Sequence, residues 1–121
     1  MYDRQIPRAE WFNFFQGFSK RHEEWPVTVR IVSPRFGAQV EACELPLEGI
    51  VADRVGGGPI SIHIGRDLGR HIEHEVVNPI QVWVEVADNG TEEALEIESN
   101  DGTKTLVLFG PETVDDVLRR A

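Results

Sequence analysis

The sequence predicts an α+β domain in which an N-terminal amphipathic helix packs on a curved antiparallel sheet of about six strands or a partial barrel, followed by a short C-terminal helix. Apolar residues alternate with polar ones in segment after segment, which is typical of half-buried strands. Turn-forming residues lie where the alternation requires the chain to reverse. The 121 residues fit a single domain, with helices at 6–24 and 111–120 around a meander at 26–109.

The first helix is predicted by aromatic residues at helical spacing. Pro7 suits the first helical turn, because the missing N–H of proline is not needed there. Four aromatic residues share one face: Trp11, Phe14, Phe15 and Phe18. We expect this face to cover the protein's own sheet, and the alternative is a helix that lies on a membrane surface or binds a partner.

The sheet is expected to begin after Trp25. Val27, Val29 and Ile31 alternate with polar residues, which predicts a strand with one buried face. In the next strand the apolar phase slips, and a β-bulge near Cys43 and Glu44 would absorb that slip.

The hairpin at 60–76 carries the best candidate site. With residues 65–69 as the connection, His63 faces His71 across the strands, and Glu73 lies on the same face. Two imidazoles and a carboxylate can bind a divalent metal with open positions, or exchange protons near neutral pH. The spacing matches no known metal motif, so an ordinary solvated face is the alternative.

His74 differs from its neighbours, because the same register points it inward. A buried neutral imidazole needs hydrogen-bond partners, and most such histidines are structural. The alternative is a small-ligand pocket between the first helix and the sheet, reached past Trp11 and His74.

The last two hairpins predict a possible interface. A loop at 88–90 places Val86 opposite Leu95, and the turn signal at 101–102 places Leu95 opposite Leu108. This register leaves three apolar side chains on the outer face, namely Trp83, Val107 and Phe109. They need a cover, which the first helix or a second subunit would supply.

The C-terminal helix is predicted over residues 111–120. Val114, Val117 and Leu118 form its apolar face. Acidic residues lie near its start and Arg119 and Arg120 near its end, an order that complements the helix dipole.

Composition excludes several classes of function. A net charge of −9 argues against binding nucleic acid through its phosphates and against an anionic membrane surface. The glycines at 56–58 lack the lysine and hydroxyl of a phosphate loop. Cys43 is the single cysteine and has no neighbour to activate it, so we expect an inert thiol. Without a signal peptide or an apolar run long enough to span a bilayer, a soluble cytoplasmic protein is predicted.

Several segments carry a family likeness. The most distinctive is Leu-Pro-Leu-Glu-Gly-Ile at 45–50. The others are Ile6 to Arg8 with Trp11 and Phe15, His22 to Trp25, Ile60 to Ile62, His71 to His74 with Pro79, and Leu95 to Glu98 before Asp101 and Gly102. Together they resemble a family of small, mainly bacterial proteins known only as a domain of unknown function. The resemblance covers nearly the whole chain and implies no activity or catalytic residue.

Two hypotheses of different classes follow. The leading one is a non-enzymatic binding module that uses the outer face to form a homodimer or to bind a protein partner. The alternative is a small metal-binding or acid–base enzyme, or a sensor, that uses His63, His71 and Glu73. The sequence identifies no catalytic residue and no cofactor, and it leaves open whether the protein is an enzyme.

Overall fold

The computed structural model describes residues 2–54, 56–65 and 71–109 of the chain. The elements found within them are β1 (Tyr2–Ile6), η1 (Arg8–Glu10), α1 (Trp11–Arg21), β2 (Pro26–Ser33), β3 (Gly37–Ala52), β4 (Ile60–Ile64), β5 (Ile72–Val76), β6 (Pro79–Val86), β7 (Glu92–Ser99) and β8 (Lys104–Phe109). The α+β class is confirmed, with eight described strands where the alternation predicted about six. The predicted C-terminal helix at 111–120 lies outside the described residues.

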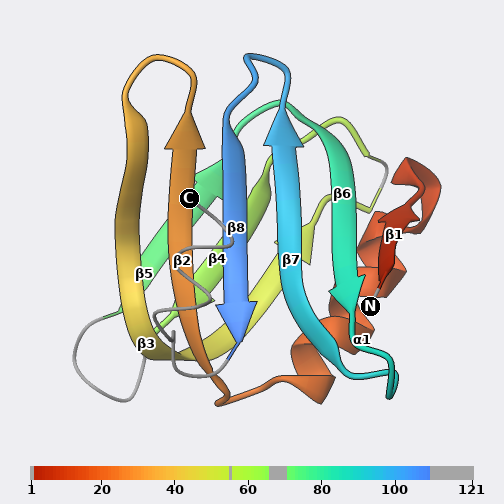
Figure 1. The fold of residues 1–121 in the computed structure, drawn as a ribbon. Coiled ribbons are helices and arrows are strands. Elements are labelled where there is room, and N and C mark those ends of the chain that lie inside the picture. The colour runs from red at the N-terminus through yellow and green to blue at the C-terminus, as the bar shows by residue number, and fades with distance from the viewer. Residues whose placement is uncertain (1, 55, 66–70, 110–121) are drawn as a thin grey trace.

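All eight strands belong to one antiparallel sheet in the order β1-β6-β7-β8-β2-β3-β4-β5 (Figure 1). The sheet folds into two layers. The first consists of β1, β6, β7, β8, β2 and the first half of β3, and the second consists of the second half of β3, β4 and β5. The first half of β3 pairs with β2, and its second half pairs with β4. β1 and β5 remain the two edge strands, so the sheet is curved but does not close into a barrel.

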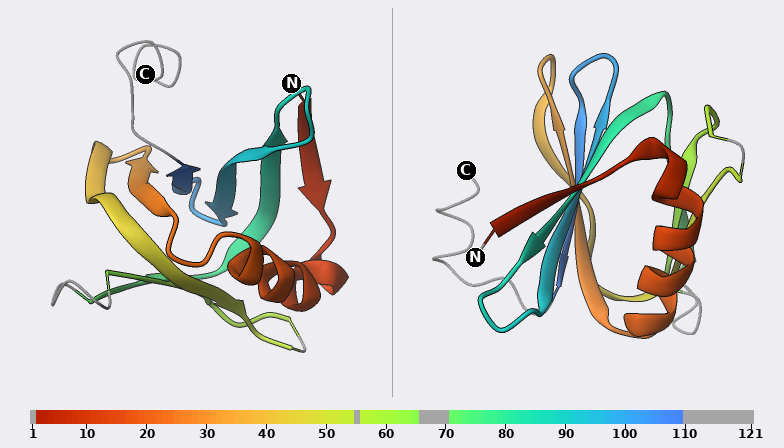
Figure 2. Two further views of the ribbon diagram at one scale, coloured as in Figure 1. Left: turned by 90° about the horizontal axis from the view of Figure 1, so that it is seen from below. Right: turned by 90° about the vertical axis from the view of Figure 1, so that its right-hand side faces the viewer.

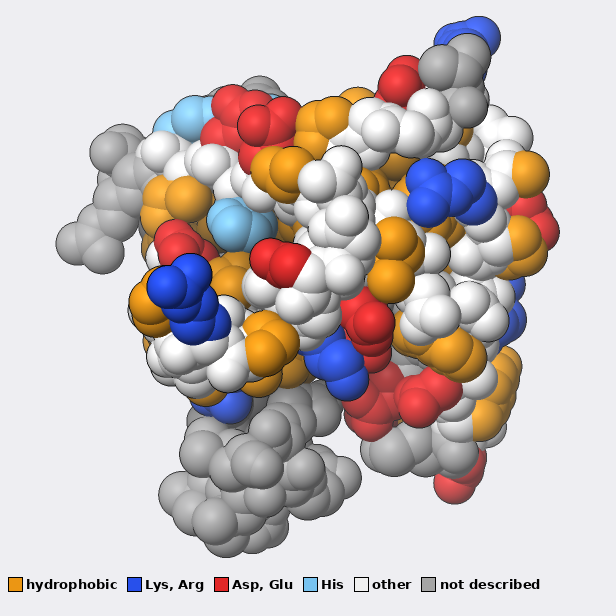
Figure 3. Space-filling model, turned by 90° about the horizontal axis from the view of Figure 1, so that it is seen from above, with side chains coloured by type: hydrophobic (Ala, Val, Ile, Leu, Met, Phe, Trp, Pro, Cys, Tyr) orange, Lys and Arg blue, Asp and Glu red, His pale blue; other side chains and the backbone are white. Residues whose placement is uncertain are grey.

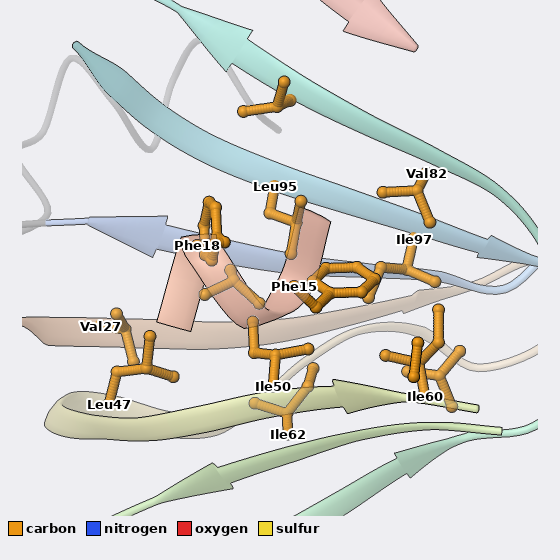
Figure 4. Packing of buried hydrophobic residues seen from close by; sticks show 14 of the residues in the cluster. Phe15, Phe18, Val27, Leu47, Ile50, Ile60, Ile62, Val82, Leu95 and Ile97 are labelled. Atoms are coloured by element: carbon orange, nitrogen blue, oxygen red, sulfur yellow. The ribbon is translucent and has the colours of Figure 1, made fainter. Parts of the chain in front are cut away.

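Helix α1 lies beside the second half of β3, on the open side of the sheet (Figure 2). Three residues of its predicted aromatic face, Trp11, Phe15 and Phe18, are buried, and the fourth, Phe14, is partly buried against the core. Figure 4 shows Phe15 and Phe18 between Leu95 and Ile97 of one layer and Ile50 and Ile62 of the other. The helix therefore fills the space that an unclosed sheet would leave open.

The predicted start of the helix is wrong, because residues 2–6 form edge strand β1. Ile6 pairs with Val82 of β6 and is buried, so the chain is extended up to Pro7. The indole N–H of Trp11 then donates to the carbonyl oxygen of Ile6 at 2.9 Å and fixes the corner.

The helix also ends earlier than predicted, at Arg21. Glu24 has a φ of 70°, a conformation incompatible with continued helix. Its N–H donates to the carbonyl oxygen of Leu47 at 2.8 Å, which ties the corner before β2 to β3.

A bulge in β3 is confirmed near the predicted position. The pairing with β2 shifts register between Val27 and Val29, opposite Cys43 and Glu44. Glu44 has a φ of 52°, and its N–H donates to Oγ1 of Thr28 at 3.3 Å. The apolar phase of β3 changes there, as its sequence indicates.

The hairpin of β4 and β5 is shifted by two residues from the predicted register. Ile64 pairs with Ile72, and His63 pairs with Glu73 instead of His71. The connection is therefore longer than predicted. A shift of two leaves every side chain on its predicted face, because strands have a period of two.

The β6–β7 hairpin shows the same kind of shift. Val84 rather than Val86 lies opposite Leu95, and a further register change between Glu85 and Val86 pairs Val86 with Glu92. Val84 and Leu95 still point into the core, as predicted.

The β7–β8 hairpin is shifted by one residue, and this shift exchanges faces. Leu95 pairs with Val107, and the N–H of Ser99 donates to the carbonyl oxygen of Thr103 at 2.8 Å. Three residues connect the strands, the last of them Gly102 with a φ of 88°, where a two-residue turn was predicted. Val107 consequently lies in the core, so its predicted place on the outer face is wrong.

Candidate metal centre

Three side chains of types that can bind a metal ion come together on the outer face of the second layer. His63 lies in β4, Glu73 lies directly opposite it in β5, and His71 immediately precedes β5. One ligand atom from each residue lies within 4.8 Å of the ligand atoms of the other two. Figure 3 shows histidine and acidic side chains next to each other on one side of the molecule. The structure thus brings together the three residues that the sequence singled out.

The isoleucines of this hairpin explain why the three side chains face outward. Ile62 and Ile64 are completely buried, and Ile72 packs against the same core. The intervening residues of each strand must then point to the opposite face. At the end of β4, Gly65 has a φ of 81° and donates its N–H to the carbonyl oxygen of Pro46 at 2.9 Å. That bond fixes where the chain leaves the strand.

The two imidazoles are diagonal neighbours rather than a direct cross-strand pair. The ring centroids of His63 and His71 lie 6.0 Å apart, with 27° between the ring planes. Glu73, the direct partner of His63, completes a triangle of donor groups on the surface. Such a triangle leaves the solvent side open.

This donor set fits a divalent transition metal. Zinc accepts imidazole nitrogen and carboxylate oxygen, and sites with three protein ligands keep a further position open. Ligand atoms on one tetrahedral zinc ion lie roughly 3.4 Å apart, so binding requires modest rotation of the three side chains. The His71 side chain is 49% exposed and has room for that rotation.

Glu48 is a fourth member of the neighbourhood that sequence reasoning missed. Its Oε2 lies 3.1 Å from Nδ1 of His71, and its side chain is 20% exposed. Glu48 lies in β3 where the pairing with β4 shifts between Leu47 and Gly49. No simple alternation predicts the direction of a side chain at such a bulge.

His74 is half-buried and lies on the face opposite the cluster, paired with Ile62. Burial lowers the pKa of His74 below its usual 6.5, and the nearby Glu41 carboxylate opposes that shift. Its predicted inward direction is confirmed, and it takes no part in the cluster.

His22 is a buried histidine that the sequence analysis did not single out. It is 3% exposed, and its ring stacks on Phe109 with centroids 4.5 Å apart. Its Nδ1 lies 2.9 Å from the carbonyl oxygen of Phe18, and its Nε2 lies 3.6 Å from Oε1 of Glu92. Because both nitrogens have partners, we regard it as structural. Its position four residues after Phe18, in line with the aromatic face, is the signal that could have identified it.

The outer face of the first layer is hollowed, and its apolar residues differ in part from the predicted Trp83, Val107 and Phe109. A depression of about 350 Å³ is lined by Asp3, Trp83, Glu85, Ala94, Leu95, Glu96, Leu106 and Leu108. Trp83 is therefore on the outer face as predicted. Phe109 is not, since it is partly buried against the core beside Phe18. The one-residue shift of β8 puts Leu106 and Leu108 where Val107 and Phe109 were expected.

In the part of the chain that the structure describes, α1 falls short of the length and apolar character needed to cross a membrane.

Comparison with known proteins places the chain in a family. No solved structure matches it significantly. An uncharacterized protein of Aquifex aeolicus (strain VF5) is similar to it, with 25% identity over 111 residues, covering 92% of this chain and 95% of the relative. Residues 2–117 match the family of unknown function DUF5335. The chain therefore belongs to the DUF5335 family, which is described as a family of unknown function.

Proposed function

We propose that the protein binds a divalent transition metal ion at His63, His71 and Glu73. The observation that carries this proposal is the distance of at most 4.8 Å between ligand atoms of all three residues. The strand register that places them on one face is fixed by buried isoleucines of the same hairpin.

The donor types indicate which ions suit the site. Two imidazoles favour zinc, nickel or cobalt over calcium and magnesium, which prefer oxygen ligands only. Three protein ligands leave at least one position for water or for a further ligand, which suits either a metal sensor or metal-assisted chemistry. A single cysteine is consistent with the reducing cytoplasm as the compartment where this binding takes place.

Calorimetry with zinc chloride, and separately with nickel chloride, tests the proposal on the whole chain. We expect a saturable heat for the natural protein, which His63→Ala and His71→Ala each abolish. At an ion concentration of about one hundred times Kd, binding stabilises the fold by about 2.7 kcal/mol, equivalent to about 10 °C in Tm.

Glu75→Gln is the matched control for these variants. Glu75 is exposed on the same face of β5, pairs with Ser61 and lies outside the cluster. Its substitution removes one carboxylate and should leave the heat unchanged. No heat and no thermal shift with either metal for the natural protein would rule the site out.

A second candidate function is protein binding by the hollow on the outer face, by self-association into a homodimer or with another protein. Trp83, Leu106 and Leu108 supply the apolar lining that such interfaces use. We expect sedimentation velocity at high micromolar concentration to show a dimer that Leu106→Glu disrupts. Val51→Glu, at an exposed position of the second layer, is the control for added charge. A strict monomer for the natural chain would contradict self-association.

A further inference from the structure

The direction of the Glu48 side chain does not follow from simple alternation along β3. Leu47 and Ile50 of β3 both point into the core. The pairing with β4 changes between Leu47 and Gly49, so Glu48 is the extra residue of a β-bulge opposite His63 and Ile64. Bulges redirect a side chain, and they are frequent next to functional sites. Here the bulge directs a carboxylate onto His71, with Glu48 Oε2 at 3.1 Å from Nδ1.

The contact determines which nitrogen of His71 can bind a metal. An ionised carboxylate only accepts hydrogen bonds, so the Nδ1 of His71 must carry the hydrogen and donate it. The lone pair of a neutral ring is then on Nε2, which is the nitrogen left for a metal ion. Histidines that bind metals almost always donate their other N–H in this manner.

We infer that Glu48 is the positioning residue of the metal centre, which holds His71 in the tautomer and orientation that presents Nε2 to the ion. This inference rests on the proposed function of the His63, His71 and Glu73 cluster. Glu48 is not one of the three residues whose ligand atoms lie within 4.8 Å of one another, so it acts through His71.

The test compares Glu48→Gln with Glu75→Gln, because each removes one carboxylate from the same outer surface. Zinc calorimetry is expected to show an affinity about 10–100-fold lower for Glu48→Gln than for the natural chain. Glu75→Gln is expected to bind like the natural chain. Melting temperatures of the two variants without metal establish that both are folded.

The second readout is the nitrogen chemical shifts of the His71 ring in the metal-free protein, measured by NMR. We expect the Nδ1–H tautomer in the natural chain and a loss of that preference in Glu48→Gln, since an amide can donate to Nδ1 as well as accept from it. A residue with a merely structural role would not change this tautomer.

The outcomes separate the inference from the proposed function. Weaker zinc binding together with the changed tautomer in Glu48→Gln supports the inference. If the natural chain binds zinc and Glu48→Gln binds equally well, the inference is overturned while the metal site stands. If the natural chain binds no zinc, the proposed function fails and the inference fails with it.

Discussion

Removing the hydroxyl of Ser19 should destabilise the protein by more than an ordinary surface substitution. Ser19 lies on α1, and its Oγ accepts from the N–H of Ile50 at 2.8 Å and donates to the carbonyl oxygen of Ile50 at 3.1 Å. Ile50 pairs with Ile62 of β4 on the other side. Because its N–H and carbonyl oxygen both bond to Ser19, they point away from β4, and this one side chain takes the place of a neighbouring strand.

The expected magnitude follows from these two bonds. Each is worth about 1 kcal/mol to the free energy of unfolding, and Ser19→Ala removes both. Alanine has the better helix propensity and returns about 0.5 kcal/mol. The net loss is about 1.5 kcal/mol, which lowers Tm by about 6 °C if unfolding entropy is about 2.1 cal/mol/K per residue over the 121 residues.

Urea denaturation followed by circular dichroism measures this loss. Two controls bracket it. Gln16→Ala changes an exposed position on the same helix, and Ser61→Ala removes a hydroxyl from the outer face of β4. Both should stay within about 0.5 kcal/mol of the natural chain. A loss for Ser19→Ala within that same range would refute the reasoning that its hydroxyl replaces a strand partner.

Three further predictions concern the core, a turn and the pH dependence. Phe18→Ala should cost about 3–5 kcal/mol in urea denaturation, because the side chain is completely buried, and a loss under 1 kcal/mol would contradict its core role. Gly102→Ala should lower Tm more than Gly90→Ala: both have a φ of 88°, but a Cβ at Gly102 would lie 3.1 Å from Cγ of Pro34, while nothing lies within 4 Å at Gly90. Equal melting temperatures would contradict that difference. Because burial lowers the pKa of His74, the unfolded chain binds more protons just below pH 6.5, so stability falls as pH drops from 6.5 through the folded pKa. The urea midpoint of His74→Gln should therefore fall less over that range than that of the natural chain, and parallel curves would contradict the assignment.

The alternation of apolar residues predicted the candidate site because it determines on which face of the sheet each side chain lies. A register error of two residues leaves every side chain on the same face. His63, His71 and Glu73 share one surface whether His63 lies opposite His71 or opposite Glu73. The buried Ile62 and Ile64 exclude the odd-numbered alternatives. The prediction of this site therefore did not depend on the exact length of the connection between β4 and β5.

Val107 and Phe109 were assigned to the wrong face, because the register error in this hairpin is one residue rather than two. Asp101 and Gly102 suit a two-residue turn and also a three-residue connection with glycine at a positive φ. The chain adopts the longer connection, in which the Thr103 N–H donates to Oδ1 of Asp101 at 2.9 Å. A difference of one residue exchanged Val107 with its neighbours on β8.

Two other features carry no periodic signal. β1 exposes four of its five residues and buries Ile6 alone, so its sequence shows no alternation to detect. Glu48 owes its direction to a bulge, whose place depends on how β3 and β4 fit together rather than on local sequence.

The central place of β8 has a consequence for synthesis. β8 is the last described strand along the chain, yet it lies between β7 and β2, and Phe109 pairs with Val27. During synthesis, the group β1-β6-β7 and the group β2-β3-β4-β5 therefore have no strand between them until Phe109 has emerged from the ribosomal exit tunnel. Until then the open edges of β2 and β7 are available to neighbouring polypeptides, so premature termination before β8 should yield aggregates rather than a smaller folded domain.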